Sequence, residues 1–103
     1  MKIKVPQKIT EGAFTYTIVL KQNVLADRHA AGFIDPIAEE IQIDPHLPPN
    51  ERTVTLCHEV SHLIERVYSL SVSDDDTDRL AHGFSCFLQQ CGIELDWSDI
   101  KEL

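Results

Sequence analysis

The chain is short of basic residues, has three cysteines and contains no long hydrophobic run. The odd number of cysteines does not make a disulfide framework, and together with the absence of an apolar signal region it indicates a reducing cytoplasm. No apolar segment approaches the ~20 residues that a membrane span needs. The sequence has no repeats and no low-complexity segment. We therefore expect a cytoplasmic protein that does not cross a membrane.

The charge balance excludes two further classes of partner. Nine Lys and Arg residues stand against 17 Asp and Glu residues, which gives a formal net charge of −8. Binding to a phosphate backbone or to an anionic membrane surface depends on clustered basic residues, so neither nucleic acid nor a membrane is the expected partner. A length of 103 residues with 43% hydrophobic content predicts one globular domain, residues 1–103, with one modest core.

Strand patterns precede helix patterns along the chain. Residues 14–20 are rich in β-branched and aromatic side chains, residues 31–35 form a short apolar run, and residues 40–44 alternate between polar and apolar. A helix is predicted from Thr53 to Leu70, capped by Asn50 or Thr53. This order predicts an α+β fold, in which a small antiparallel or mixed sheet has the helices on one face.

A second helix is predicted to begin at Ser73, because Ser-Asp-Asp-Asp resembles a capping box with acids at the positive helix end, and to end at Gly92. The tail is expected to pack through Trp97. The first helix is predicted to pack on the core through Leu56, Val60, Leu63, Val67 and Leu70. The second is predicted to turn inward Thr77, Ala81, Phe84, Leu88 and Cys91. All three cysteines, Cys57, Cys86 and Cys91, are interpreted as packing residues.

The most informative feature is His58-Glu59-Val60-Ser61-His62, which lies inside the first predicted helix. Two histidines four residues apart share one helix face, about 6 Å apart along the axis, and can bind one metal ion between them. Glu59 is rotated by about 100° from His58, so its carboxylate can reach a water molecule on that ion without being a ligand. This arrangement is typical of zinc hydrolases.

A catalytic zinc ion needs a third protein ligand. Glu65 shares the histidine face but lies about 10 Å along the axis from His58, which favours an outer or solvated position. Asp74, Asp75 and Asp76 occupy the first turn of the second helix, where helix capping explains them. Asp78 lies one turn further, with His82 four residues beyond on the same face. The residues alone leave open whether Asp78 faces a metal or the solvent.

The runs CHEVSHLIE and DRLAHGFSCFL, separated by a short spacer, resemble the ImmA/IrrE-type and phage-encoded minimal gluzincin metallopeptidases. That family pairs HExxH with a downstream Glu-x-x-Ala-x-x-Phe helix, whose acid is the third zinc ligand. Asp78, Ala81 and Phe84 fall on those positions, with Asp in place of the usual Glu. The segment AAGFIDPIAEEIQID resembles the strands that precede HExxH, of which the one nearest the helix lines the substrate cleft. The resemblance implies that His58, His62 and Asp78 bind Zn²⁺.

The expected function is therefore a zinc metallopeptidase that acts on a peptide or protein substrate. Glu59 takes a proton from a zinc-bound water and passes it to the leaving amine. The candidates for stabilising the oxyanion are Tyr68, Tyr16, His82 and His29. The strand at residues 40–44 is expected to bind an extended peptide by β-addition. Two alternatives remain: an inactive binding or regulatory module that retains the zinc site, and an interaction protein whose motif is accidental. The oligomeric state is open.

Overall fold

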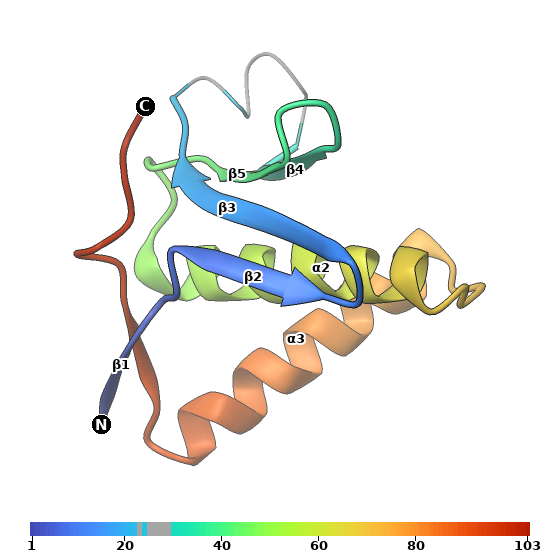
Figure 1. The fold of residues 1–103 in the computed structure, drawn as a ribbon. Helices are drawn as coiled ribbons and strands as arrows, with labels where there is room; N and C mark the ends of the chain where they lie inside the picture. The colour runs from blue at the N-terminus through green and yellow to red at the C-terminus, as the bar shows by residue number, and fades with distance from the viewer. Residues whose placement is uncertain (23, 25–29) are drawn as a thin grey trace.

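The computed structural model of the chain describes residues 1–22, 24 and 30–103. It contains two sheets and two long helices, in the expected α+β arrangement (Figure 1). No helix in these residues is long and apolar enough to cross a membrane. In chain order the elements are β1 Lys2–Lys4, β2 Lys8–Glu11, β3 Phe14–Leu20, β4 Gly32–Asp35, β5 Glu40–Ile43, α2 Pro49–Val67, α3 Asp74–Gln90 and β6 Glu94–Asp96.

The larger sheet has the strand order β2-β3-β5-β4 and is mixed. β3 and β5 are parallel, whereas β2 and β4 are antiparallel to their neighbours. All three strands predicted from the sequence are confirmed to within one residue at each end. Because β5 is paired on both sides, it has no edge for a peptide, and the prediction of β-addition at residues 40–44 is wrong. β2 and β4 are the edge strands of this sheet, and both contact α2, β4 more extensively.

The two ends of the described chain form a second, two-stranded sheet, which the sequence pattern did not predict. β1 and β6 are parallel, and the Met1 ammonium donates to the carbonyl oxygen of Gly92 at 2.7 Å. Both strands are three residues long and β1 is exposed throughout, so neither carries a hydrophobic alternation. After β6, Trp97 packs against the core as predicted, and Ile100 is buried within it.

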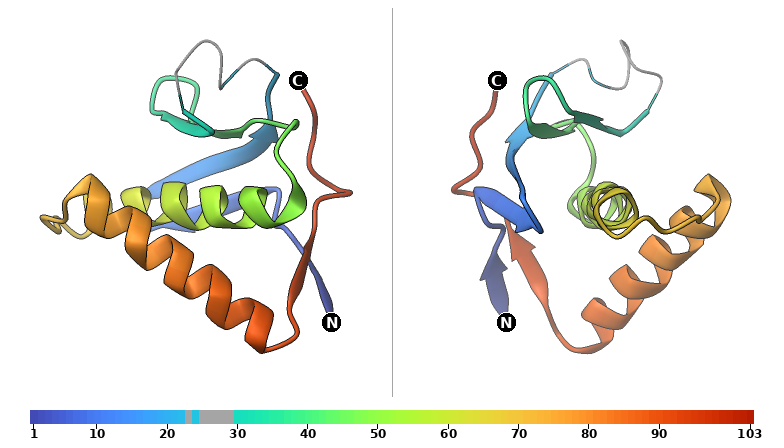
Figure 2. Two further views of the ribbon diagram at one scale, coloured as in Figure 1. Left: turned by 180° about the vertical axis from the view of Figure 1, so that it is seen from behind. Right: turned by 45° about the vertical axis from the view of Figure 1, so that its right-hand side comes forward.

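Helix α2 lies between the larger sheet and α3, as the two views of Figure 2 show. It begins at Pro49, four residues before the predicted start, with Pro48 at the N-cap and no side-chain cap. The predicted caps Asn50 and Thr53 are therefore wrong, because a proline at the first helical position needs no partner for the N–H that it lacks. Four predicted stripe residues pack in or against the core, but Leu70 lies past the helix end and is 54% exposed.

Helix α3 begins as predicted, since the Ser73 hydroxyl accepts a hydrogen bond from the Asp76 N–H at 3.1 Å. It ends at Gln90, followed by Gly92 at φ +73°. Its buried residues are small, namely Thr77, Ala81 and Ser85. Phe84 and Cys91, which were placed on the inner stripe, are exposed. Small side chains let α3 approach α2 closely, so the large ones turn outward. Cys86 is also exposed, and only Cys57 is partly buried, where desolvation raises the pKa of its thiol.

Candidate metal centre and cleft

The two histidines of the motif converge on the face of α2 that is turned toward α3. Their Nε2 atoms are 2.9 Å apart, and their ring centroids are 4.6 Å apart at an interplanar angle of 71°. Each side chain is about a quarter exposed, at 23% for His58 and 28% for His62. Helical spacing brings the rings together, and the packing of α3 against α2 shields them while leaving a path from solvent.

Each imidazole has a carboxylate at its other nitrogen. Nδ1 of His62 lies 3.2 Å from Oε1 of Glu65, and Nδ1 of His58 lies 3.3 Å from Oδ1 of Asp78. A carboxylate holds the imidazole proton on Nδ1, which leaves the lone pair on Nε2. If both protons are held on Nδ1, the two Nε2 lone pairs face each other at 2.9 Å and repel unless a proton or a metal cation lies between them. The arrangement favours a cation at this point.

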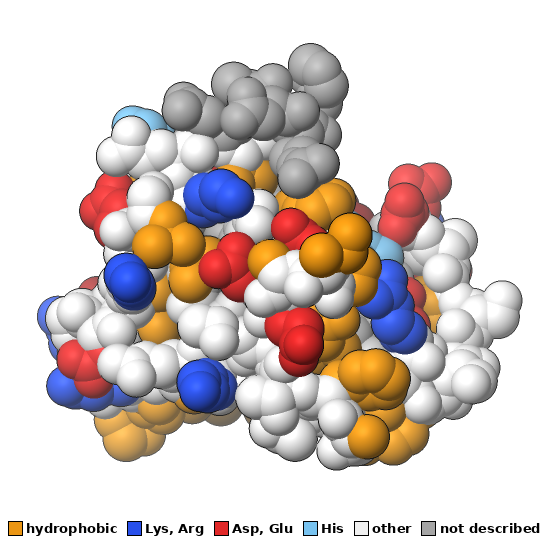
Figure 3. Space-filling model, turned by 45° about the horizontal axis from the view of Figure 1, so that its top comes forward, with side chains coloured by type: hydrophobic (Ala, Val, Ile, Leu, Met, Phe, Trp, Pro, Cys, Tyr) orange, Lys and Arg blue, Asp and Glu red, His pale blue; other side chains and the backbone are white. Residues whose placement is uncertain are grey.

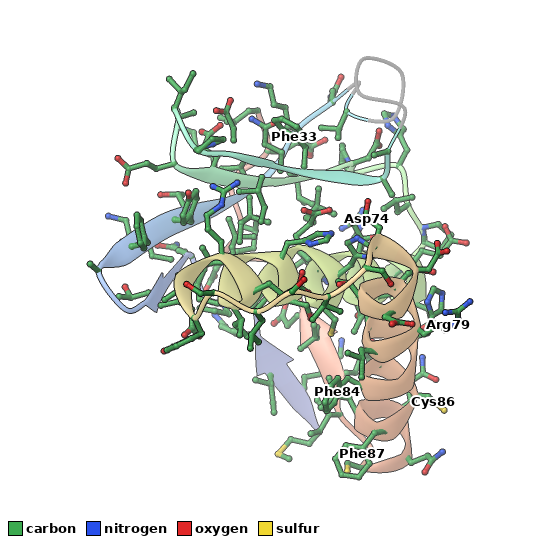
Figure 4. The ribbon with its side chains drawn as sticks, turned by 90° about the vertical axis from the view of Figure 1, so that its right-hand side faces the viewer. Phe33, Asp74, Arg79, Phe84, Cys86 and Phe87 are labelled. Carbon is green, nitrogen blue, oxygen red and sulfur yellow. The ribbon has the colours of Figure 1, made fainter. Side chains whose placement is uncertain are left out.

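Asp74 is the acid that the structure brings to the converging nitrogens. Its Oδ1 lies 3.2 Å from Nε2 of His62, and one ligand atom each of His58, His62 and Asp74 lies within 4.8 Å of the others. Figure 4 shows Asp74 at the end of α3 that meets α2. Asp78 is one turn further along and contacts His58 on the opposite side of the ring. This geometry departs from the expected ligand set, in which Asp78 was the third ligand and Asp74 only a capping residue.

This donor set fits a zinc ion. A tetrahedral ion with ligand bonds of about 2.0–2.2 Å separates its ligand atoms by about 3.3 Å. The distances of 2.9 Å between the histidine nitrogens and 3.2 Å from His62 to Asp74 are within a few tenths of an ångström of that separation, and the third pair, His58 and Asp74, lies within 4.8 Å. Two neutral imidazoles and one carboxylate are also the donor types of catalytic zinc sites, which keep a fourth position open.

Glu65 joins the two helices behind His62. The Thr77 hydroxyl donates to Oε2 of Glu65 at 2.7 Å, while Oε1 faces Nδ1 of His62. Thr77 is fully buried, and the Glu65 side chain is only 15% exposed. The sequence left Glu65 either as an outer partner of the site or as a solvated residue, and these contacts favour the outer partner. Because Thr77 is on α3, the same contact fixes α3 beside the histidine pair.

Glu59 lies on the neighbouring face of α2 and is 8% exposed. Desolvation raises the pKa of its carboxyl group to about 7; His58 opposes this shift and Asp74 adds to it. Two hollows of about 180 and 370 Å³ both include Glu59 among their lining residues. Both hollows are lined in part by β4, and the two together are called the cleft here. In Figure 3 acidic side chains lie beside the pale-blue histidine surface at the right of the view. A carboxyl group with a pKa near neutrality is suited to proton transfer.

Gly32 is a point at which β4 approaches α2 tightly beside the cleft. A Cβ atom at this position would lie 2.6 Å from Cγ2 of Thr55 and 3.1 Å from Cγ of Glu59. Only a glycine lets β4 pass so close to α2, and this approach buries Glu59. No local sequence pattern distinguishes Gly32 from the other glycines.

Replacing Gly32 by Ala should push β4 away from α2 and destabilise the protein by about 1–3 kcal/mol, the usual cost of overpacking. Urea unfolding at low protein concentration measures the change. The matched control is Gly83→Ala on α3, where the new Cβ meets nothing within 4 Å and helix propensity should stabilise by about 0.5–1 kcal/mol. Equal effects of the two substitutions would contradict a tight contact at Gly32.

The four candidates for oxyanion stabilisation are placed very differently. Tyr16 is 3% exposed in the hydrophobic core, and the Tyr68 hydroxyl donates to Oε2 of Glu11 at 3.3 Å. His82 lies on α3, with Nδ1 2.9 Å from the carbonyl oxygen of Asp78 and 3.6 Å from Oδ2 of Asp78. His29 lies outside the described residues. Among those described, His82 is the one in contact with a residue of the candidate site.

A sequence signal for Asp74 did exist. Asp74 precedes Thr77 by three residues and Ala81 by seven, so it lies in line with these two buried residues, at the exposed start of α3 where its side chain is 87% exposed; Asp78 follows one turn later. The pair mirrors the spacing of His58 and His62 on α2. No protein-family model, curated protein sequence or solved structure matches the chain.

Proposed function

We propose that the chain is a zinc-dependent hydrolase of peptide bonds, in which His58, His62 and Asp74 bind the metal ion and Glu59 is the general base. One observation carries the proposal. Both Nε2 atoms of the HExxH histidines converge on one point, where Asp74 joins them, while carboxylates occupy both Nδ1 atoms. A purely structural pair of histidines does not need Glu59, a carboxyl group buried at the wall of the adjoining cleft.

The residues divide the chemistry between them. When bound, zinc supplies a Lewis acid that polarises the substrate carbonyl and lowers the pKa of a water molecule toward ~7. Glu59 accepts the proton of the attacking water and delivers it to the leaving amine. In the metal-free chain its pKa is about 7, above the ordinary value of a carboxyl group, because the side chain is desolvated. Glu65 and Asp78 orient the two imidazoles, and His82 is the candidate donor to the oxyanion.

The cleft indicates how a substrate binds. β4 is an edge strand that contributes Gly32 to the smaller hollow and Phe33 and Ile34 to the larger one, with Glu59 common to both. An extended peptide laid along β4 therefore crosses the position of Glu59. Leu70 and Ile34 give the larger hollow an apolar wall, which suits an apolar side chain on one side of the scissile bond.

The test is metal content followed by cleavage. Untagged protein is expected to carry about one zinc ion per chain by elemental analysis and to cleave an unfolded protein or a peptide library read by mass spectrometry. Chelation should abolish cleavage, and added zinc should restore it. Zinc without cleavage of any substrate would contradict the hydrolase and favour a binding module. Protein that takes up no zinc when supplied with it would contradict the metal site as well.

A further inference from the structure

Helix α3 exposes an apolar stripe on a face that the candidate site does not use. Leu80, Phe84 and Phe87 are 52%, 58% and 60% exposed. Together with Val72 and Gly83 they line a shallow groove of about 650 Å³, which Asp76 and Arg79 border at one end. Figure 4 shows Phe84 and Phe87 on one side of α3 and Cys86 on the other. Exposed apolar side chains that gather in one stripe mark an interaction surface.

The stripe also lacks charge. A quarter of the residues in the chain are charged, yet residues 80–93 contain no Asp, Glu, Lys or Arg. The nearest charged side chains at the groove, Asp76 and Arg79, are paired with each other at 3.0 Å. An exposed helix face normally carries charges, and their depletion is the compositional mark of the centre of a protein interface. No like charges therefore face each other at the centre of the stripe when two copies meet there.

The pattern within the stripe is symmetric. Leu80 and Phe87 are equally distant from a point midway between Gly83 and Phe84. In an antiparallel pairing of two α3 helices about a two-fold axis at that point, Leu80 lies opposite Phe87 of the second copy. Phe84 then lies opposite Gly83, which has open space around its missing Cβ. A self-complementary surface of this kind is what an isologous dimer requires.

We propose that two copies of this chain form an antiparallel dimer through the α3 stripe, with Leu80, Gly83, Phe84 and Phe87 at its centre. An aromatic side chain offers roughly 150–250 Å² of surface. At the observed exposures the three large residues then bury roughly 100 Å² each, and with the groove rim the contact is roughly half of the ~800 Å² per partner of a standard interface. The dimer is accordingly weak and concentration-dependent. This proposal does not depend on the metal site.

Sedimentation equilibrium of untagged protein tests the proposal, with a reductant present because Cys86 and Cys91 are exposed. The mass is expected to rise with concentration from the 11.7 kDa of one chain toward twice that value. Phe87→Glu should weaken dimerisation by more than tenfold, since each dimer would receive two buried charges. Cys86→Glu, on the opposite side of the same helix, should change it less than twofold. Circular dichroism checks that both variants retain the fold.

A third variant separates this pairing from unspecific hydrophobic contact. Gly83→Leu adds apolar surface to the stripe but fills the space that Phe84 of the second copy needs. The proposed pairing predicts at least tenfold weaker association, whereas unspecific association would become stronger. A chain that stays monomeric at all concentrations, or a Gly83→Leu variant that associates more tightly, would overturn the proposal. So would binding of a foreign helical peptide to the stripe of a monomeric chain.

Discussion

Glu59→Gln is expected to lower the rate of peptide hydrolysis by roughly 10²–10⁴-fold, the contribution of a positioned general base. Glutamine keeps the size and polarity of the side chain but cannot accept a proton from water. The variant should still carry about one zinc ion per chain, because the proposed zinc ligands are His58, His62 and Asp74 and do not include Glu59. Steady-state cleavage rates and elemental analysis on the same preparations measure the two effects. A variant that cleaves at the wild-type rate would show that Glu59 is not the base.

Measuring the free energy of unfolding of Glu59→Gln distinguishes a lost base from a lost fold. Burial raises the pKa of Glu59 from its ordinary 4.5 to about 7. Between these values the unfolded chain releases a proton that the folded chain retains, so stability of the metal-free protein falls as pH rises through this window. Glutamine has no such penalty. Metal-free Glu59→Gln should therefore be more stable than wild type above pH 7, by on the order of 2–3 kcal/mol, and the difference should vanish below pH 4.5.

Asp74→Ala is expected to weaken zinc binding by more than ~100-fold, because it removes a ligand that supplies both charge and geometry. Asp78→Ala should weaken it by about 10–100-fold, the range for residues that only orient a ligating histidine. Competition with a chelator of known affinity measures both. The order of the two effects follows from which ring nitrogen each carboxylate contacts, Nε2 of His62 for Asp74 and Nδ1 of His58 for Asp78.

Asp75→Ala is the matched control, since Asp75 is in the same first turn and exposed. It should leave zinc affinity unchanged and cost at most about 1 kcal/mol of stability through the helix dipole. If Asp78→Ala loses more affinity than Asp74→Ala, the ligand assignment reverses to the one that the family resemblance implied. The histidine pair and the role of Glu59 would be unaffected by that reversal.

Much of the local structure follows from residues that interact with near neighbours in the chain. The strands at residues 14–20 and 40–43 carry their own side-chain pattern, Ser73 caps its own helix, and His58 and His62 share a face because of helical spacing. Elements without a pattern of their own escaped prediction. β1 is an exposed three-residue strand and β6 a partly buried one, and they form only because distant parts of the chain meet.

The residues of the candidate site also differ in how far local sequence predicts their positions. The sequence by itself predicts that His58, Glu59 and His62 lie together, because about one turn of helix separates the first from the last. It favoured Asp78 over Asp74 as the third ligand, because helix capping explained Asp74 and the resemblance placed an acid at Asp78. The contacts of each acid depend instead on the register of α3 against α2. That register is decided by contacts between helices: the buried small residues of α3, and the Thr77–Glu65 hydrogen bond.

Tertiary structure alone also decided which strand borders the cleft and which face of α3 remains open. β4, and not β5, is at the edge because β3 pairs with β5 across an intervening strand in the sequence. Gly32 is significant only because α2 passes within contact of it. The helical spacing of Phe84 predicts a core position, yet its side chain is exposed. The reason is that the close packing of two helices admits only small side chains between them. Such facts depend on distances between elements, and no local pattern in a sequence encodes those distances.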